Sequence, residues 1–401
     1  MSPSITSGEY ASRMQSLQGA MRQLDVDVFV VSAFDSIFYL TGAGFEPLER
    51  PFFLLVFRDR PAKLLVPLLD CEHMKKARNV SSEDIHTYRD FPAPVAEAWS
   101  ARLNAHNADA GRVGVEPSIP KCVYDEISAS SLVVAPLVEQ LRLVKSPTEI
   151  ELIRRAARFA DLGVRKLLDA SYFGSLVCEG FAQTSRVSAR IIRDVPDWDP
   201  VTTKVVMATW AAPRSAQPHS IPGLDDMLGP GPHVALVLTR INGYCAESER
   251  TYFTKTPSTC ERTMFAAMLE ARRIAFSLLR PGVPCDEIDL AVGEFLAGEG
   301  FSEPQQRLHR VGHGIGLGTH EGPWLAAGSD DILRENMVIS IEPGIYADGM
   351  GGFRHSDTVR VTRDGHECLT EFPDDLQRLT CRRWRPFARF RGRLIRHALG
   401  L

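Results

Sequence analysis

The sequence predicts a two-domain α+β protein, in which an α/β N-terminal domain precedes a larger domain of mixed helices and strands. Three observations lead to this prediction. The chain has 401 residues, more than one hydrophobic core usually organises. A strong helix-start signal stands at Ser146, and short strand-like apolar runs occur on both sides of it. We place the domains at residues 1–143 and 144–380, followed by a tail at 381–401.

The N-terminal domain is predicted to begin with a helix of about 20 residues. Its apolar face consists of Tyr10, Met14, Leu17, Met21 and Leu24, which recur at spacings of three and four residues. Apolar runs bounded by turn residues then predict buried strands. These strands are expected at 26–31, 52–57, 64–68 and, as the last of the domain, 112–115.

The second domain is predicted to begin at the segment Ser146-Pro147-Thr148-Glu149. Ser can cap free amides, Pro suits the first helical position, and Glu three residues after Ser completes a capping box. The apolar positions that follow recur at helical spacing, so this helix should lay one face on a sheet. Further helices are expected near 180–193, 261–280 and 285–299, and strands at 204–207, 233–238, 337–341 and 358–361.

The tail differs in composition from the rest of the chain. Arginines alternate there with aromatic and aliphatic residues such as Trp384, Phe387, Phe390 and Leu394. One interpretation is a helix that binds a membrane surface or a partner. We favour packing on the body of the protein or across a dimer interface, because exposed aromatic side chains would reduce solubility.

The overall composition limits the class of function. With 44% hydrophobic residues, 24% charged residues and a formal net charge of -4, neither a disordered chain nor a nucleic-acid-binding protein is indicated. We therefore expect a small-molecule substrate. No apolar run is long enough to span a bilayer and the first ten residues do not resemble a signal peptide, which predicts a cytoplasmic protein. Eight cysteines without a Cys-x-x-Cys pair indicate free thiols.

Three glycine-containing segments define the candidate site. They are Gly312–Leu317 with His320 close behind, Ser340–Gly344, and Gly351–Asp357. Glycines beside a polar side chain permit close approach of a ligand and are poor helix or strand residues. Glu342, which ends an apolar run before a Pro-Gly turn, should lie at the mouth of a sheet. A single histidine would be interpreted as a core residue, but the three segments together favour a site.

These segments resemble the creatinase/methionine aminopeptidase/prolidase family in their order and spacing, as do residues 218–220 and 243–251. The stretches 145–150 and 38–42 are similar to those of its creatinase/prolidase branch, which has an additional N-terminal domain. The resemblance covers roughly residues 10–380 and implies a C-terminal pita-bread domain. It is more specific for the fold than for the reaction.

The metallopeptidases of this family bind two metals through two Asp, one His and two Glu. Carried over by position, the His falls on His313, the first Glu on Glu342 and the second Asp on Glu247. These three residues could hold a single divalent metal, since three protein ligands and a water can make a catalytic site.

The other two ligand positions have lost their donors. The first Asp would lie 11 residues before Glu247, on Leu236 or its neighbour Val237, and the last Glu falls on Ser356. A bridging carboxylate is needed to hold two metals about 4 Å apart. We therefore expect no dinuclear centre and, as the main interpretation, no metal cofactor.

The resemblance to creatinase, which works without metal, implies other roles for the same segments. Its proton-shuttling His matches His219, and its substrate-binding Glu, followed by Arg-Thr, matches Glu249. A His that titrates near neutrality could take a proton from water and return it to the leaving nitrogen. Glu249 and Glu342 could hold a cationic nitrogen, while His313 and His320 could donate to an oxyanion.

The expected substrate pocket departs from that of creatinase. The Arg and Glu with which creatinase binds the carboxylate and guanidinium of its substrate fall on Trp324 and His355, which makes creatine itself doubtful. Glu247 and Arg354 are further candidates for substrate binding, although Arg354 and Asp357 could instead form a structural ion pair.

A contribution from a second subunit is also implied by the resemblance. Arg50 stands where creatinase has an Arg that reaches the site of the neighbouring subunit. We therefore expect a homodimer with Arg50 contributed across its interface.

Three functions remain open at this point. The preferred one is metal-independent hydrolysis of a C–N bond in a small non-peptide substrate, such as an amidine, lactam or amide. The second is a metal-dependent Xaa-Pro dipeptidase or a related lyase. The third is a non-catalytic binding protein on the same scaffold.

Overall fold

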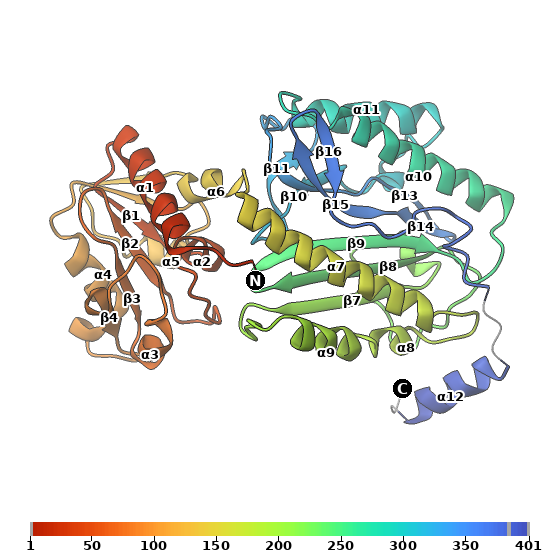
Figure 1. The fold of residues 1–401 in the computed structure, drawn as a ribbon, viewed down its shortest axis with the longest axis horizontal. Helices are drawn as coiled ribbons and strands as arrows, with labels where there is room; N and C mark the ends of the chain where they lie inside the picture. Colours follow the sequence, from red (N-terminus) through yellow and green to blue (C-terminus); the bar gives the residue numbers. More distant parts are fainter. Residues whose placement is uncertain (1–2, 383–385, 399–401) are drawn as a thin grey trace. The chain divides into compact units, whose positions relative to one another are not determined.

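The computed structural model describes residues 3–382 and 386–398, which fall into two compact units. One unit covers Pro3–Leu143 and the other begins at Val144. Each unit combines helices with a β-sheet, as Figure 1 shows. The predicted mixed fold class is confirmed.

The N-terminal unit is built on a six-stranded sheet with the order β4-β3-β2-β1-β5-β6. Its strands are β1 (Val28–Val31), β2 (Phe53–Phe57), β3 (Lys63–Pro67), β4 (Ile85–Tyr88), β5 (Arg112–Val115) and β6 (Ser131–Val134). Its helices are α1 (Ser7–Gln23), α2 (Phe34–Thr41), α3 (Cys71–Met74), α4 (Trp99–Asn107), α5 (Lys121–Tyr124) and α6 (Leu137–Arg142).

The N-terminal predictions hold except at the last strand. In α1 the predicted apolar face is buried from Tyr10 to Met21, while Leu24 lies past the end of the helix and is 38% exposed. The prediction that residues 112–115 form the last strand is wrong, because β6 pairs parallel to β5. The strand has a short apolar run, Leu132–Val134, but Ser131 and Val134 are exposed and the two residues between them are only partly buried.

The second unit is built on an eight-stranded sheet. Seven strands follow the order β11-β10-β12-β15-β9-β8-β7, and β16 pairs with β15 beside this path. The strands are β7 (Lys204–Trp210), β8 (His233–Ile241), β9 (Tyr244–Tyr252), β10 (Gly312–Gly314), β11 (Glu321–Leu325), β12 (Val338–Ile341), β15 (Ser356–Thr362) and β16 (Gly365–Cys368). A separate two-stranded sheet consists of β13 (Gly344–Ala347) and β14 (Gly351–Arg354).

Helix α7 (Pro147–Ala170) covers one face of the large sheet and lies over β8 and β9 in Figure 1. The predicted capping box is present, since Ser146 and Glu149 each accept a hydrogen bond from the backbone amide of the other. Gly163 lets the helix approach the sheet closely, because a Cβ at this position would lie 2.5 Å from Val237 Cγ1. Val237 therefore faces α7.

The remaining helices of this unit lie at or near the predicted places. The segment predicted at 180–193 forms two helices, α8 (Val177–Phe181) and α9 (Thr184–Asp194). Helices α10 (Thr259–Leu278) and α11 (Cys285–Gly298) match the predictions within a few residues. Five short 3-10 helices are also described, three within the first unit and two within the second. They are Leu68–Asp70, Ser82–Asp84, Val95–Glu97, Arg214–Ala216 and Pro304–Gln306.

The C-terminal segment forms α12 (Ala388–Ala398). Its Arg391 and Arg396 make ion pairs with Glu179 and Asp225, so the helix packs on the second unit at least through these contacts. Arg383, Trp384 and Arg385 of the predicted tail lie outside the described residues.

Two general expectations concern membrane spans and cysteines. Among the described residues, no helix is long and apolar enough to cross a membrane. All eight cysteines are free thiols, of which Cys178, Cys245 and Cys285 are buried.

Candidate functional site

The candidate site lies on the central strands of the large sheet, on the face away from α7. Val237 faces α7, so its neighbour Leu236 points to the opposite face, where Glu249 stands directly across from it on β9. Glu249 in turn pairs in register with Ser356 on β15. The strand register thus decides between Leu236 and Val237 and puts Leu236 on the site face.

His313 is held in the middle of β10 by its two neighbouring glycines. A Cβ on Gly312 would collide with the backbone oxygen of Ser340, and one on Gly314 would collide with the backbone oxygen of Gly322. The glycines therefore serve the close approach of neighbouring backbone, not of a ligand as the sequence analysis assumed. This packing fixes the position of the imidazole.

The His313 ring has one nitrogen engaged and one without a hydrogen bond. Nδ1 lies 3.0 Å from the backbone oxygen of Gly314. Nε2 is buried and has no hydrogen-bond partner among the described residues. It faces two carboxylates, 3.4 Å from Glu342 Oε1 and 3.6 Å from Glu247 Oε1. The His320 ring lies beside it, with ring centroids 4.1 Å apart.

The charges in this cluster shift the pKa values of its members. Burial lowers the pKa of His313, but the opposing effect of Glu342 and Glu247 is larger and raises this pKa to about 9. Burial raises the pKa of Glu342, but the nearby His313, His309 and Arg354 outweigh it and lower this pKa to about 2. Without a bound cation the pair is therefore an imidazolium facing a carboxylate at neutral pH.

Glu247 is anchored by two hydroxyl groups. Ser356 Oγ donates to Glu247 Oε1 at 2.8 Å, and Ser340 Oγ donates to the same oxygen. The two hydroxyl oxygens lie 2.8 Å from each other. All three side chains are buried, so the orientation of the Glu247 carboxylate is fixed by the strands β9, β12 and β15.

Glu249 forms a buried ion pair on the same face. Its Oε1 accepts a hydrogen bond from Arg354 Nη2 at 2.6 Å, while its Oε2 has no partner among the described residues. Burial raises the pKa of Glu249 above its usual range, helped by Glu342 and Glu247, while Arg354 opposes this shift and favours the ionised carboxylate. The expected ion pair between Arg354 and Asp357 is wrong, because Asp357 pairs with Arg250 and Arg272 instead.

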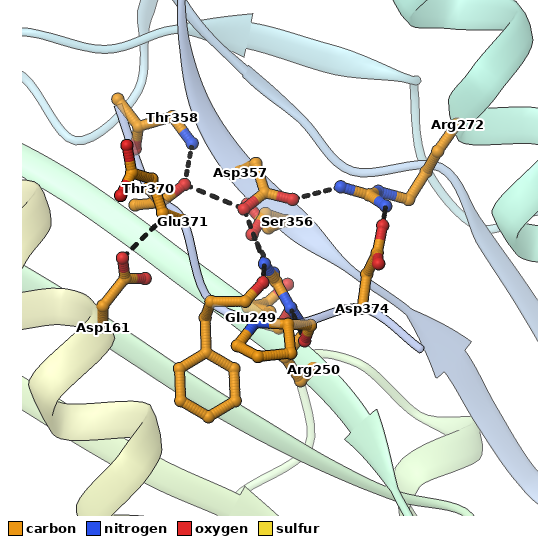
Figure 2. Close-up of polar contacts among 12 residues, drawn as sticks. Asp161, Glu249, Arg250, Arg272, Ser356, Asp357, Thr358, Thr370, Glu371 and Asp374 are labelled. Atoms are coloured by element: carbon orange, nitrogen blue, oxygen red, sulfur yellow. Dashed lines mark hydrogen bonds and ion pairs between the residues drawn. The ribbon is translucent and has the colours of Figure 1, made fainter. Parts of the chain in front are cut away.

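Asp357 belongs to a network behind the site, which Figure 2 shows. It accepts hydrogen bonds from Arg250 Nη2 at 2.8 Å and from Arg272. Arg250 also donates to the backbone oxygens of Glu249 and Ser356, at 2.7 and 3.0 Å. This network ties β9 to β15 and so fixes two residues of the site from behind.

The loop that carries His320 is held by a second buried interaction. Lys145 Nζ lies 2.9 Å from Glu321 Oε1, and Glu321 Oε2 accepts a hydrogen bond from the backbone amide of Gly318 at 2.9 Å. His320 itself remains exposed. Burial lowers the pKa of His320, and the charge of His313 lowers it further.

The structure brings most of the predicted site residues together. The group consists of Glu247, Glu249, His313, His320, Glu342 and Arg354. Burial lowers the pKa of His309, and the charge of the exposed His219 adds to this shift. Trp324 pairs in register with His313 on the neighbouring strand, is 39% exposed and lies under the Arg310 guanidinium.

Two predicted residues are not in this group. His355 is fully buried against the ring of Phe265 on α10, and burial and the charges of Arg250 and Arg272 hold its pKa well below its usual range. Arg50 belongs to the N-terminal unit, where its Nη1 lies 3.2 Å from Asp90 Oδ2.

Two further residues, His309 and Tyr346, lie beside the site and were not predicted from the sequence. His309 Nε2 lies 2.7 Å from the hydroxyl of Tyr346, and Arg354 Nη1 donates to the same hydroxyl at 3.3 Å. The only signal for His309 was its place four residues before His313. Tyr346 follows the Pro-Gly turn after Glu342 and looked like an ordinary strand residue.

Comparison with known proteins identifies the family of both units. Residues 151–363 match the model of metallopeptidase family M24, and residues 13–144 match the creatinase/prolidase N-terminal domain. A Xaa-Pro dipeptidase of Lactobacillus helveticus is 30% identical over 378 residues, which cover 91% of this chain and 98% of the relative. The putative dipeptidase YkvY of Bacillus subtilis is 29% identical over 373 residues, which cover 91% and 99% of the two chains.

Solved structures agree on the fold. The dipeptidase PepE of Mycobacterium ulcerans has a TM-score of 0.78 at 24% identity, covering 93% of this chain and 98% of its own. The prolidase of Pyrococcus horikoshii has a TM-score of 0.76 at 23% identity, covering 91% and 99%. The expected pita-bread domain behind a creatinase-type N-terminal domain is therefore confirmed.

The expectation that the chain has no metal cofactor is wrong. The matching family model describes metallopeptidases, and Glu247, His313 and His320 offer ligand atoms that all lie within 4.8 Å of one another. A neutral His313 that donates from Nδ1 to a backbone oxygen leaves Nε2 free as a ligand, the usual arrangement in metal sites. These residues fit a divalent cation. His320 was expected to bind substrate, so it was not counted among the side chains that could hold a metal.

The preferred function in the sequence analysis is also wrong. The similarity to relatives named as dipeptidases contradicts a metal-independent, creatinase-like hydrolase of a non-peptide substrate. The assignment to the metal-independent creatinase branch relied on the donors missing at Leu236 or Val237 and at Ser356, and on the matches at Glu249 and His219.

Both halves of the chain match family models, and the M24 match alone spans more than half of its length. The chain therefore belongs to metallopeptidase family M24, with a creatinase/prolidase N-terminal domain in front, and is a hydrolase of C–N bonds.

Proposed function

We propose that this protein is a metal-dependent dipeptidase, with Xaa-Pro dipeptides as the first substrates to test. One observation carries the proposal: Glu247, His313 and His320 converge within 4.8 Å, and the buried His313 Nε2 has no hydrogen-bond partner among the described residues. The names of the relatives supply the substrate class.

The metal site is formed by residues from three elements. Glu247 on β9 and His313 on β10 supply fixed ligands, and the loop after β10 supplies His320. Glu342 adds a carboxylate 3.4 Å from His313 Nε2. A divalent cation held there would polarise the peptide carbonyl and lower the pKa of a water. His219, which is exposed, carries the proton to the leaving amine.

The carboxylates also select for a free amino terminus. Glu249 Oε2 has no hydrogen-bond partner in the part of the chain that the structure describes, and the Glu342 side chain remains 15% exposed. A positively charged α-amino group offers the N–H donors that these oxygens lack. Arg354 holds Glu249 in place from the other side.

A homodimer is the second part of the proposal. Arg50 carries a positive charge on the N-terminal unit, and its counterpart in creatinase serves the neighbouring subunit's site. A cation there would pair with the carboxylate end of a dipeptide.

The test is hydrolysis of a dipeptide panel by protein that has been stripped with chelator and reloaded with Mn²⁺, Co²⁺ or Zn²⁺. We expect cleavage of Xaa-Pro dipeptides only after reloading, and none of the N-acetylated versions. Equal activity of the stripped and the reloaded protein, or no cleavage of any dipeptide, would contradict the proposal.

A further inference from the structure

We infer that the site holds one divalent cation and not two, an inference that rests on the proposed metal-dependent function. The described side chains supply one complete set of donors. Glu247, His313 and His320 form it, and their ligand atoms lie within 4.8 Å of one another. Three protein ligands with water suffice for a catalytic metal.

One position on the site face, beside the Glu249 carboxylate, offers no donor. Leu236 lies there, directly across the strand pair from Glu249, and its apolar side chain cannot bind a cation. Its neighbour Val237 cannot replace it, because Val237 packs against Gly163 of α7. A second cation would therefore meet hydrocarbon where it needs a carboxylate.

Hydroxyl groups occupy the other side of this position. Ser356 and Ser340 both donate to Glu247 Oε1. They are neutral, and their protons already point at the oxygen that a second cation would have to share. A bridging carboxylate is what holds two metals about 4 Å apart, so these hydrogen bonds compete with the bridge.

The net charge of the cluster also favours one bound divalent cation. Glu247, Glu249 and Glu342 carry at most three negative charges, and the buried Arg354 neutralises one of them. One divalent cation balances the two that remain. A second would leave an excess of positive charge in a buried site, which is costly.

The experiment is a direct count of bound metal. Chelator-stripped protein is equilibrated with Mn²⁺ and measured by plasma emission spectrometry and by titration calorimetry. We expect one equivalent per chain, and an electron paramagnetic resonance spectrum of isolated Mn²⁺ without the coupling of an ion pair. Two equivalents with a coupled spectrum would overturn this inference and leave the proposed function standing. No binding at millimolar Mn²⁺ would overturn both.

A gain-of-site variant tests the cause. Leu236→Asp combined with Ser356→Glu restores two carboxylates and should bind a second Mn²⁺, whereas the neutral control Leu236→Asn with Ser356→Gln should stay at one. A folded double-acid variant that still binds one equivalent would show that the missing donors do not set the number. Circular dichroism checks folding, and the count on the unmodified protein remains decisive if the variant fails to fold.

Discussion

At the scale of single residues, the function of the site depends on which groups are already satisfied. His313 Nδ1 is engaged by the backbone oxygen of Gly314, while Nε2 has no hydrogen-bond partner among the described residues and faces the carboxylates of Glu342 and Glu247. Glu247 keeps its orientation only because two serine hydroxyls hold it. A residue type alone would not reveal either feature, since both depend on contacts between strands.

The first prediction concerns His313. Replacing it with alanine should lower Mn²⁺ affinity at least about 100-fold, because even outer-shell partners of metal ligands are worth 10–100-fold. Titration calorimetry of the stripped protein measures this. The control is His366→Ala, on an exposed residue of β16 that stacks on Phe276 outside the site. Equal loss of affinity in both variants would remove His313 from the metal site.

The second prediction concerns Glu249. Glu249→Gln should raise KM for a dipeptide about 10-fold, a loss of about 1.4 kcal/mol, with a smaller effect on kcat. The reason is the lost charge opposite the substrate's amino group. A melting curve must accompany the measurement, because the variant leaves Arg354 without its ionised partner. A folded variant with unchanged KM would show that the amino group binds elsewhere.

At the scale of elements, periodicity in the sequence predicted some strands and helices but not the polar strand that carries Glu247 and Glu249. The apolar strands and the capped helix α7 were predictable from periodicity. Strand β9 was not, because its sequence from Tyr244 to Tyr252 is polar and lacks the usual alternation. All nine of its residues are nevertheless buried, since Arg250 and its neighbours are satisfied by hydrogen bonds that only the folded chain provides.

The third prediction tests the contact between α7 and the sheet. Gly163→Ala should destabilise the protein by about 1–3 kcal/mol, because the new methyl group overpacks against Val237. The matched control is Gly298→Ala at the end of α11, where a Cβ meets nothing within 4 Å. That change should be neutral or stabilising by up to about 1 kcal/mol. Urea unfolding measures both, and equal effects would contradict the tight contact.

The fourth prediction uses Asp161 on α7, whose carboxylate accepts a hydrogen bond from the Glu371 amide (Figure 2). Burial raises the pKa of Asp161 from 3.8 to about 6. Between these values the folded protein binds more protons than the unfolded chain, so stability falls as pH rises. Asp161→Asn should therefore stabilise the protein at pH 7.5, by at most about 3 kcal/mol, and lose this advantage near pH 4.

Unfolding by urea at the two pH values measures this difference. Asp330→Asn, on an exposed carboxylate of the same unit, serves as the control. A stabilisation by Asp161→Asn that is the same at both pH values would come from something other than the buried charge.

At the scale of the whole molecule, the residues of the proposed site come from both units. The second unit contains every donor of the metal site, and the first contains Arg50. The capping box at Ser146, which was readable from the sequence, lies two residues after Val144, where the second unit begins. The sequence was not sufficient to predict the reaction, because the ligand atom of His320 comes within 4.8 Å of those of Glu247 and His313 only in the folded chain.

The fifth prediction is that Arg50 acts in the partner's site of a homodimer. Arg50→Ala and His313→Ala should each be inactive as pure proteins, the first without the substrate-binding cation and the second without a metal ligand. In a co-refolded mixture, half of the dimers combine one chain of each kind. Each of these has one intact site, formed by the unmodified His313 of one chain and the unmodified Arg50 of the other, so the mixture should recover about a quarter of the normal activity.

The arrangement within one chain gives a different result. If Arg50 served its own subunit, no dimer in the mixture would have an intact site, and the mixture would stay inactive. Light scattering at the assay concentration establishes whether dimers are present at all. Mixing without unfolding is the control, because activity should then appear only as fast as subunits exchange. Recovery of activity therefore requires both the dimer and the shared site, and a monomer or an inactive heterodimer would contradict one or the other.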